Sequence, residues 1–278
     1  MENKIYFGER TGVLKQNKYD FAMLKRLFLN LYISLDDGCN FQEATGHYCT
    51  DGNIRGYLGQ DIEAAVFLKT GLEDVWPIRN YIENYDEAKL FTIIEFLYDH
   101  VSAPTDKYYH NWDDCGWHAT KFNKEEGQNL FFKEINKLLY RYENDYYLTK
   151  TGEIHNVSPD GLTVLVEKQI ISGDAKNIDD RVQYAISKFL KYSSSIAEKK
   201  DAVRTLGDVL EFYHEQGIKL ENKDDSDLFN IINRFDLRHH NKDQQSYYDK
   251  DFWYEWLFYT FLASINVLVK LQKGDLSN

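Results

Sequence analysis

The residues best suited to chemistry lie close together near the C-terminus. The segment 233–241, NRFDLRHHN, holds two arginines and two adjacent histidines. A histidine can take a proton from a ribose 2′-hydroxyl or give one to a leaving oxygen, because its pKa lies near neutrality. An arginine guanidinium can hold a phosphate and stabilise the negative charge that it gains. These residue types favour metal-free cleavage of a phosphodiester, with three catalytic candidates, Arg234, His239 and His240.

The spacing of this cluster decides whether its side chains can meet. Arg234 and Arg238 are four residues apart and share one face of a helix. Arg234 and His239 are five residues apart, which separates them by ~140° on a continuous helix. They converge only if the helix ends near Leu237 or if a second chain completes the site. The alternative is a solvated helix end, where basic side chains complement the helix dipole. In the catalytic interpretation, substrate is bound by Arg238, Asn241 and Lys242.

A second group of reactive side chains combines three cysteines with a histidine. Two residues separate Cys115 from His118, which is a ligand-like spacing. Three thiols and one imidazole can hold a tetrahedral zinc ion, and the ligands would then be Cys39, Cys49, Cys115 and His118. Against that alternative, we expect no cofactor and three free, mostly buried cysteines. A sparse, odd set of thiols forms no disulfide framework and favours a reducing compartment, so we expect a cytoplasmic protein.

The elements that would position these groups are mainly helical, because apolar residues recur at helical spacing along most of the chain. Residues 146–157 carry the one good strand signal, a hairpin with Gly152 in its turn. Two segments, 36–59 and 101–122, are predicted to be loops or irregular structure. The main helices are expected over 18–35, 61–70, 87–100, 124–143, 177–194, 198–216, 225–237 and 250–272.

The best break in the pattern is the short polar run SGDAK at 172–176. It divides the chain into a helical N-terminal domain over 1–172, with the hairpin at about 146–157, and a four-helix bundle over 173–278. The predicted fold class is mainly α.

Charge and hydropathy exclude several classes of protein. The net charge of −12 opposes non-specific coating of DNA, although a locally basic site for RNA is compatible with it. The apolar stretch 252–271 is long enough to span a bilayer. We expect it to be a buried helix of the bundle or a dimer interface, with a tail anchor as the alternative. The charged N-terminal residues predict no signal peptide.

The C-terminal cluster resembles the HEPN superfamily of helical domains, whose signature is an Arg followed after four to six residues by a His. Arg234-x4-His239 and Arg234-x5-His240 both fit, and the resemblance covers about 175–278. The N-terminal part, over about 5–160, is similar to abortive-infection proteins of the AbiJ type. Three short motifs carry that similarity: FGERTG at 7–12, EINKLL at 134–139 and the strand residues YYL and GEI of the hairpin.

The resemblance implies a metal-independent endoribonuclease that acts as an effector in bacterial anti-phage defence. Its partner would be RNA, and two copies would form a homodimer whose arginines and histidines line one cleft. Arg234 would bind the phosphate, and His239 or His240 would be the general acid or base. The alternative is a non-catalytic sensor or scaffold of a defence complex, which dimerises or binds a partner protein or nucleic acid through its C-terminal helices.

Overall fold

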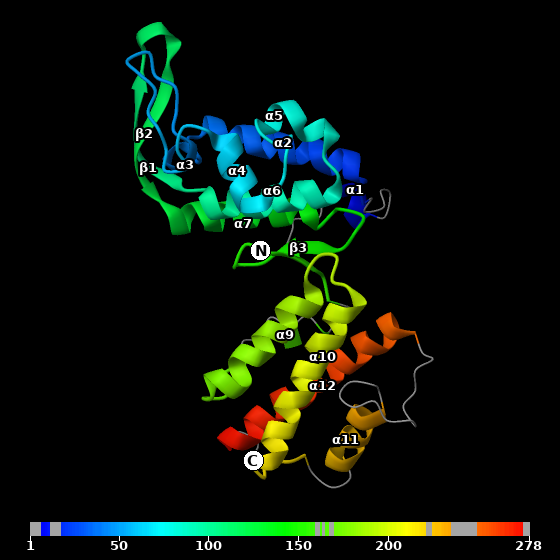
Figure 1. Ribbon diagram of the computed structural model, residues 1–278. Helices are drawn as coiled ribbons and strands as arrows, with labels where there is room; N and C mark the ends of the chain where they lie inside the picture. The colour runs from blue at the N-terminus through cyan, green and yellow to red at the C-terminus, as the bar shows by residue number, and fades with distance from the viewer. Residues whose placement is uncertain are drawn as a thin grey trace. The chain divides into compact units, whose positions relative to one another are not determined.

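The structure is a computed structural model that describes residues 7–11, 18–158, 162, 165–166, 170–220, 224–234 and 249–274 (Figure 1). The chain divides into two compact units, unit 1 over Met1–Ile154 and unit 2 over His155–Asn278. The break expected from the sequence after residue 172 lies further along the chain, inside unit 2. The fold is mainly α, as predicted: the described part contains two-stranded sheets only, and helices make up most of the rest.

Unit 1 is built on three long helices, which are α2 (Phe21–Asp37), α6 (Glu87–His100) and α7 (Lys124–Leu139). Side-chain oxygens of Asp20, Asp86 and Asn123 accept hydrogen bonds from the first turns of these helices, which explains where each one begins. α6 is the central helix, because its side chains are buried around most of its circumference. Shorter helices complete the unit: α1 (Phe7–Arg10), α3 (Gln42–Thr45), α4 (Ile62–Thr70) and α5 (Ile78–Tyr81).

The segment 101–122, predicted to be irregular, instead forms an antiparallel hairpin. Strand β1 (Ala103–His110) pairs with β2 (Gly116–Asn123), with Tyr108 opposite His118 and His110 opposite Gly116. Figure 1 shows this hairpin extending beyond the helices of unit 1, with the loop after α3 running beside it. We call the hairpin and that loop, residues 46–59, the arm. The prediction failed because most of β1 is exposed on both faces, so its sequence lacks the alternation of a half-buried strand.

The second hairpin is the predicted one. It pairs β3 (Tyr146–Leu148) with β4 (Ile154–Asn156). Gly152 has a φ of +90°, and a Cβ at this position would lie 2.3 Å from the ring of Tyr98. Glycine is therefore needed both for the backbone conformation of the turn and for its close approach to α6.

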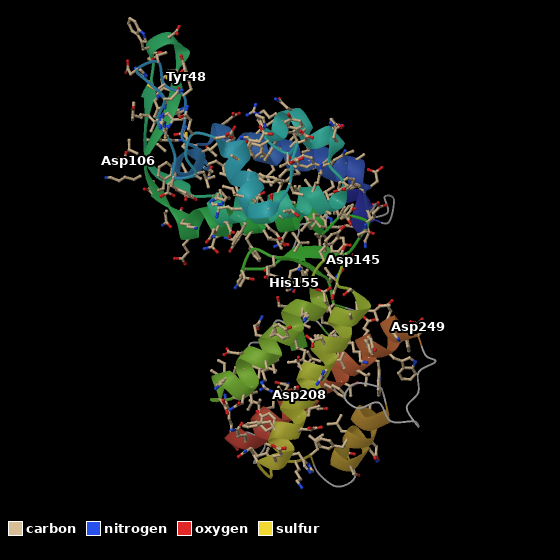
Figure 2. The ribbon with its side chains drawn as sticks, in the orientation of Figure 1. Tyr48, Asp106, Asp145, His155, Asp208 and Asp249 are labelled. Atoms are coloured by element: carbon tan, nitrogen blue, oxygen red, sulfur yellow. The ribbon has the colours of Figure 1, made fainter. Side chains whose placement is uncertain are left out.

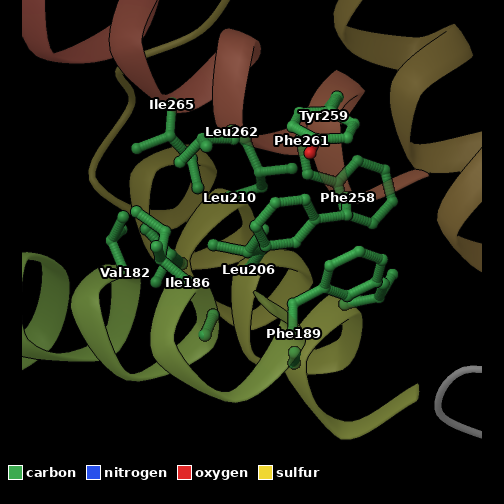
Figure 3. Close-up of a cluster of buried hydrophobic side chains, with 14 of the residues drawn as sticks. Val182, Ile186, Phe189, Leu206, Leu210, Phe258, Tyr259, Phe261, Leu262 and Ile265 are labelled. Atoms are coloured by element: carbon green, nitrogen blue, oxygen red, sulfur yellow. The ribbon is translucent and has the colours of Figure 1, made fainter. Parts of the chain in front are cut away.

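Unit 2 contains the four helices expected from the sequence: α9 (Asp180–Leu190), α10 (Ile196–Glu215), α11 (Asp224–Arg234) and α12 (Lys250–Lys273). A π-helical turn, Ala175–Asp179, leads into α9. The core lies between α9, α10 and α12, where the ring of Phe189 stacks on that of Phe258 at 4.1 Å between centroids (Figure 3). Around this pair lie Leu206, Leu210, Phe261, Leu262 and Ile265.

Helix α12 is the longest of the described helices. By length and composition alone it could cross a membrane, with a mean hydropathy of 1.2 over its best 18-residue window, and it is the one described helix that meets this criterion. Half of that window is buried inside the protein. Side chains of α12, including Phe258, Phe261 and Ile265, fill the core of unit 2. α12 thus packs as a core helix, which was the expected interpretation of 252–271.

Candidate metal centre

The Arg/His cluster predicted as a catalytic site lies outside the described residues, apart from the backbone of Arg234. That residue is the last one of α11. The other predicted members follow it in the chain: Arg238, His239, His240, Asn241 and Lys242.

The second predicted group is described, and the structure brings three of its four members together. Cys49, Cys115 and His118 meet in the arm, and the fourth position is taken by His110. One donor atom from each of these four side chains lies within 4.8 Å of the others. Among the described residues, no other group of histidines, cysteines and carboxylates gathers in this way.

Cys39, the remaining predicted ligand, lies outside the cluster. It follows the end of α2 with a φ of 69°, and its thiol donates a hydrogen bond to the carbonyl oxygen of Trp117 at 3.5 Å. Burial raises the pKa of the Cys39 thiol. A buried thiol that keeps its proton is inert both as a nucleophile and as a ligand.

The loop of the arm brings Cys49 to the hairpin. His47 and Ile54 exchange backbone hydrogen bonds at 2.9 and 3.0 Å, which closes the loop that contains Cys49. Gly46 makes this possible: its φ is +75°, and a Cβ there would lie 2.1 Å from the carbonyl oxygen of Ile54. In Figure 2 the neighbouring Tyr48 lies beside the outer part of the hairpin, whereas Asp106 lies nearer the helices.

The turn of the hairpin positions the other three ligands. His110 is the last residue of β1, and Cys115 directly precedes β2. A short 3-10 turn, Trp112–Asp114, lies between them, and both Asp113 and Gly116 have positive φ. This tight turn just before β2 brings the Cys115 thiol beside the His118 ring, with 3.2 Å between Sγ and Nε2.

Two short sulfur–nitrogen contacts define the geometry of the cluster. The Sγ atom of Cys49 lies 3.5 Å from Nδ1 of His110, and the Sγ atom of Cys115 lies 3.2 Å from Nε2 of His118. On the far side of the His110 ring, Nε2 lies 3.6 Å from a carboxylate oxygen of Asp51. Each imidazole therefore turns one ring nitrogen towards the sulfur atoms.

Burial lowers the pKa of two imidazoles at this site, His118 and His47, and so favours their neutral form. His118 is 2% exposed, and burial, followed by the nearby His110, lowers its pKa below the usual value. His47 stacks on the His118 ring at 4.2 Å, and its pKa is also lowered by burial and by His118. The neutral imidazole is the form that ligates metals.

Two thiols and two imidazoles form a complete set of four protein ligands for a tetrahedral ion. Such sets are typical of structural sites, because catalytic zinc sites use three protein ligands and keep one position for water. His110 was missed in the sequence although the signal was present as His110-x4-Cys115-x2-His118. The strand register supplies the missing information. Tyr108 pairs with His118, and His110 lies two residues further along β1, so His110 and His118 are on the same face of the hairpin.

Comparison with known protein families, with curated proteins and with solved structures finds no match to this chain.

Proposed function

We propose that the chain is a metal-independent endoribonuclease that acts as an effector in bacterial anti-phage defence. The observation that supports this most is the organisation of unit 2. Four of its described helices, α9 to α12, agree in number with the helical domain that the HEPN resemblance implies, and residues 238–242 lie in the chain between α11 and the long helix α12. The catalytic group in this proposal consists of Arg234, His239 and His240.

The proposed reaction needs one base, one acid and one cation. One histidine takes the proton of the ribose 2′-hydroxyl, and the 2′-oxygen attacks the adjacent phosphorus. A second histidine gives its proton to the departing 5′-oxygen, which leaves a 2′,3′-cyclic phosphate and a 5′-hydroxyl. Arg234 binds the phosphate and stabilises its extra negative charge. Arg238, Asn241 and Lys242 bind the RNA backbone. Arg238 and Lys242 supply local positive charge in a chain of net charge −12.

The direct experiment measures RNA cleavage by the purified full chain in magnesium-free buffer containing EDTA. Arg234→Ala and a double His239→Ala/His240→Ala variant are expected to lose at least ~100-fold in rate, because general acid–base groups contribute that much or more. Arg204→Ala is the matched control, since Arg204 is an exposed arginine on α10, outside the cluster. Its rate is expected to be unchanged.

Product ends distinguish the proposed chemistry from contamination. Cleavage that leaves 2′,3′-cyclic phosphates and is lost in the cluster variants supports the proposal. Intact RNA, together with phage protection that is the same in wild type and in the variants, would overturn it.

One feature of the surface favours the second candidate function, a non-catalytic scaffold that dimerises through its C-terminal helices. Phe252 and Trp256 on α12 are 63% and 41% exposed, although nine other side chains of that helix are buried. They line an open, apolar pocket of about 440 Å³ together with Leu162 and Leu165. A second copy of the chain is the occupant that this candidate requires.

Light scattering measures whether the chain is a dimer or a monomer. Trp256→Glu is expected to convert a dimer to a monomer. A wild-type monomer would exclude both the scaffold dimer and a shared catalytic cleft.

A further inference from the structure

We propose that Cys49, His110, Cys115 and His118 bind one zinc ion, which ties the loop 46–59 to the tip of the β1–β2 hairpin. This structural centre is independent of the proposed ribonuclease activity, because the arm belongs to unit 1 and the catalytic residues belong to unit 2.

The distances between donor atoms fit the size of zinc. Zinc binds sulfur at about 2.3 Å and imidazole nitrogen at about 2.0–2.1 Å, so a tetrahedral arrangement places donor atoms ~3.3–3.8 Å apart. The two sulfur–nitrogen distances here are 3.5 and 3.2 Å. All four donors lie within 4.8 Å of one another. A closing movement of about an ångström or less is enough for them to surround one ion.

The chemistry of the ligands selects the metal. Thiolates are soft ligands and imidazole is intermediate, a combination that suits zinc and disfavours magnesium and calcium. On binding, each thiol loses its proton, so that Zn²⁺ is neutralised by two thiolates and two protons enter the solvent. With two thiolates and two neutral imidazole ligands, the zinc centre carries no net charge, which is compatible with the buried or half-buried positions of the two thiols.

Asp51 occupies the outer position expected around a zinc-binding histidine. When Nδ1 of His110 faces the ion, Nε2 carries the hydrogen and faces the Asp51 carboxylate at 3.6 Å. A carboxylate that accepts this hydrogen fixes the tautomer and the orientation of the ring, and closure of the 3.6 Å gap on metal binding would bring Asp51 into that role. Asp51 is therefore a positioning residue and not a ligand.

The arm also needs such a link for its stability. A two-stranded hairpin is at best marginally stable on its own, and the side chains of Tyr108, Tyr109 and Trp117 along this one are exposed. Metal-binding free energy acts as folding free energy where no hydrophobic core is available. A four-ligand ion at the tip would supply the folding free energy that the exposed strands do not gain from apolar burial.

The test is the metal content of the full chain, purified without added metal and measured by mass spectrometry. We expect one zinc per chain in the wild type and in Cys39→Ser, which removes the neighbouring buried thiol that lies outside the cluster. We expect loss of zinc in Cys49→Ser and Cys115→Ser. Asp51→Asn is expected to bind zinc about 10–100-fold more weakly, which is the usual effect of removing such an outer carboxylate.

A second measurement keeps the test decisive if a cysteine variant fails to fold. The wild-type chain is stripped of metal and titrated with Co²⁺. One equivalent is expected to give the visible absorption of tetrahedral cobalt together with thiolate charge-transfer absorption. Absence of zinc with no such spectrum would overturn the proposal, as would a wild-type protein in which Cys49 and Cys115 form a disulfide. Ribonuclease activity is measured separately with Arg234→Ala. If no ribonuclease activity is found, the zinc and cobalt measurements still test the metal centre.

Discussion

Unit 2 and the arm of unit 1 are stabilised in different ways. In unit 2, α9, α10 and α12 enclose one continuous apolar core, in which Phe189 and Phe258 stack face to face. The arm has two strands and a loop with few buried apolar side chains, and its most buried contacts are those of Cys49 and His118. Burial of apolar area stabilises the first region. The arm is held by the backbone pairing of β1 with β2, by hydrogen bonds between the Gln42 side chain and β2 at its base, and by the Cys/His cluster at its tip. The two regions are therefore expected to respond to different perturbations.

Removal of metal is expected to have the largest effect, and this effect is confined to the arm. Treatment with a chelator should remove the proposed zinc ion from its four ligands and expose the backbone amides of β1 and β2. Hydrogen exchange measured by mass spectrometry is expected to show loss of protection over 103–123 and unchanged protection in α10. Equal protection of the hairpin with and without chelator would show that the arm does not depend on a bound metal.

The next largest effect is expected from truncation in the core of unit 2. Phe258→Ala removes a fully buried ring and the stacking contact that this ring makes with Phe189. The change should lower the free energy of unfolding by about 3–5 kcal/mol. The control on the same helix is Phe252→Ala, an exposed ring whose loss should cost within about 0.5 kcal/mol of zero. Urea denaturation measures both variants. Similar costs for the two would show that the core described for α12 is wrong.

A third effect concerns pH and a buried histidine of α6. His100 accepts or donates one hydrogen bond with the Tyr57 hydroxyl at 2.9 Å, and burial, with a smaller contribution from Lys69, lowers its pKa to about 4. The unfolded chain binds a proton below pH ~6.5, whereas the folded chain does so only near pH 4. Stability should therefore fall as the pH drops from 6.5 towards 4, by up to about 3 kcal/mol.

His100→Gln removes this titration and tests its origin. The urea midpoint of the variant should change less than that of the wild type between pH 7 and pH 4.5. The other histidines titrate in both proteins, so their contributions cancel in the difference. Parallel pH profiles would assign the acid sensitivity to groups other than His100.

The smallest effect is expected at the start of α10. The Ser195 hydroxyl accepts from the backbone N–H of Glu198 at 3.2 Å, and the Glu198 carboxylate accepts from the backbone N–H of Ser195 at 2.8 Å. Ser195→Ala should lower stability by about 1 kcal/mol, because a first-turn N–H loses its partner. Ser195→Thr keeps a hydroxyl that accepts from the Glu198 N–H and donates to the Glu198 carboxylate, and it should restore most of the melting temperature. An equal loss in both variants would indicate that the side-chain cap contributes little.

The helices were predictable because their signal is local. Apolar residues at helical spacing lie along α7 and along α9 to α12, and the alternation around Gly152 marks the β3–β4 hairpin. The β1–β2 hairpin was not predictable by this route, because its exposed aromatic residues follow no alternating pattern. Exposed strands lack the periodicity that burial imposes.

The candidate metal centre was only partly predictable, because it depends on register. The spacing of Cys115 and His118 was visible in the sequence, but the inclusion of His110 follows from the pairing of β1 with β2. The sequence grouped Cys39 with the other cysteines as a ligand. In the structure Cys39 itself has a positive φ, and its thiol donates to the Trp117 carbonyl oxygen and not to the cluster. The Arg/His cluster at 234–242 stays a prediction.

The most direct test of the metal centre is the zinc content of three proteins purified in parallel: the wild type, Cys39→Ser and Cys115→Ser. We expect one zinc per chain in the first two and none in the third. Zinc that is absent from all three, or that is lost equally in Cys39→Ser and Cys115→Ser, would contradict it.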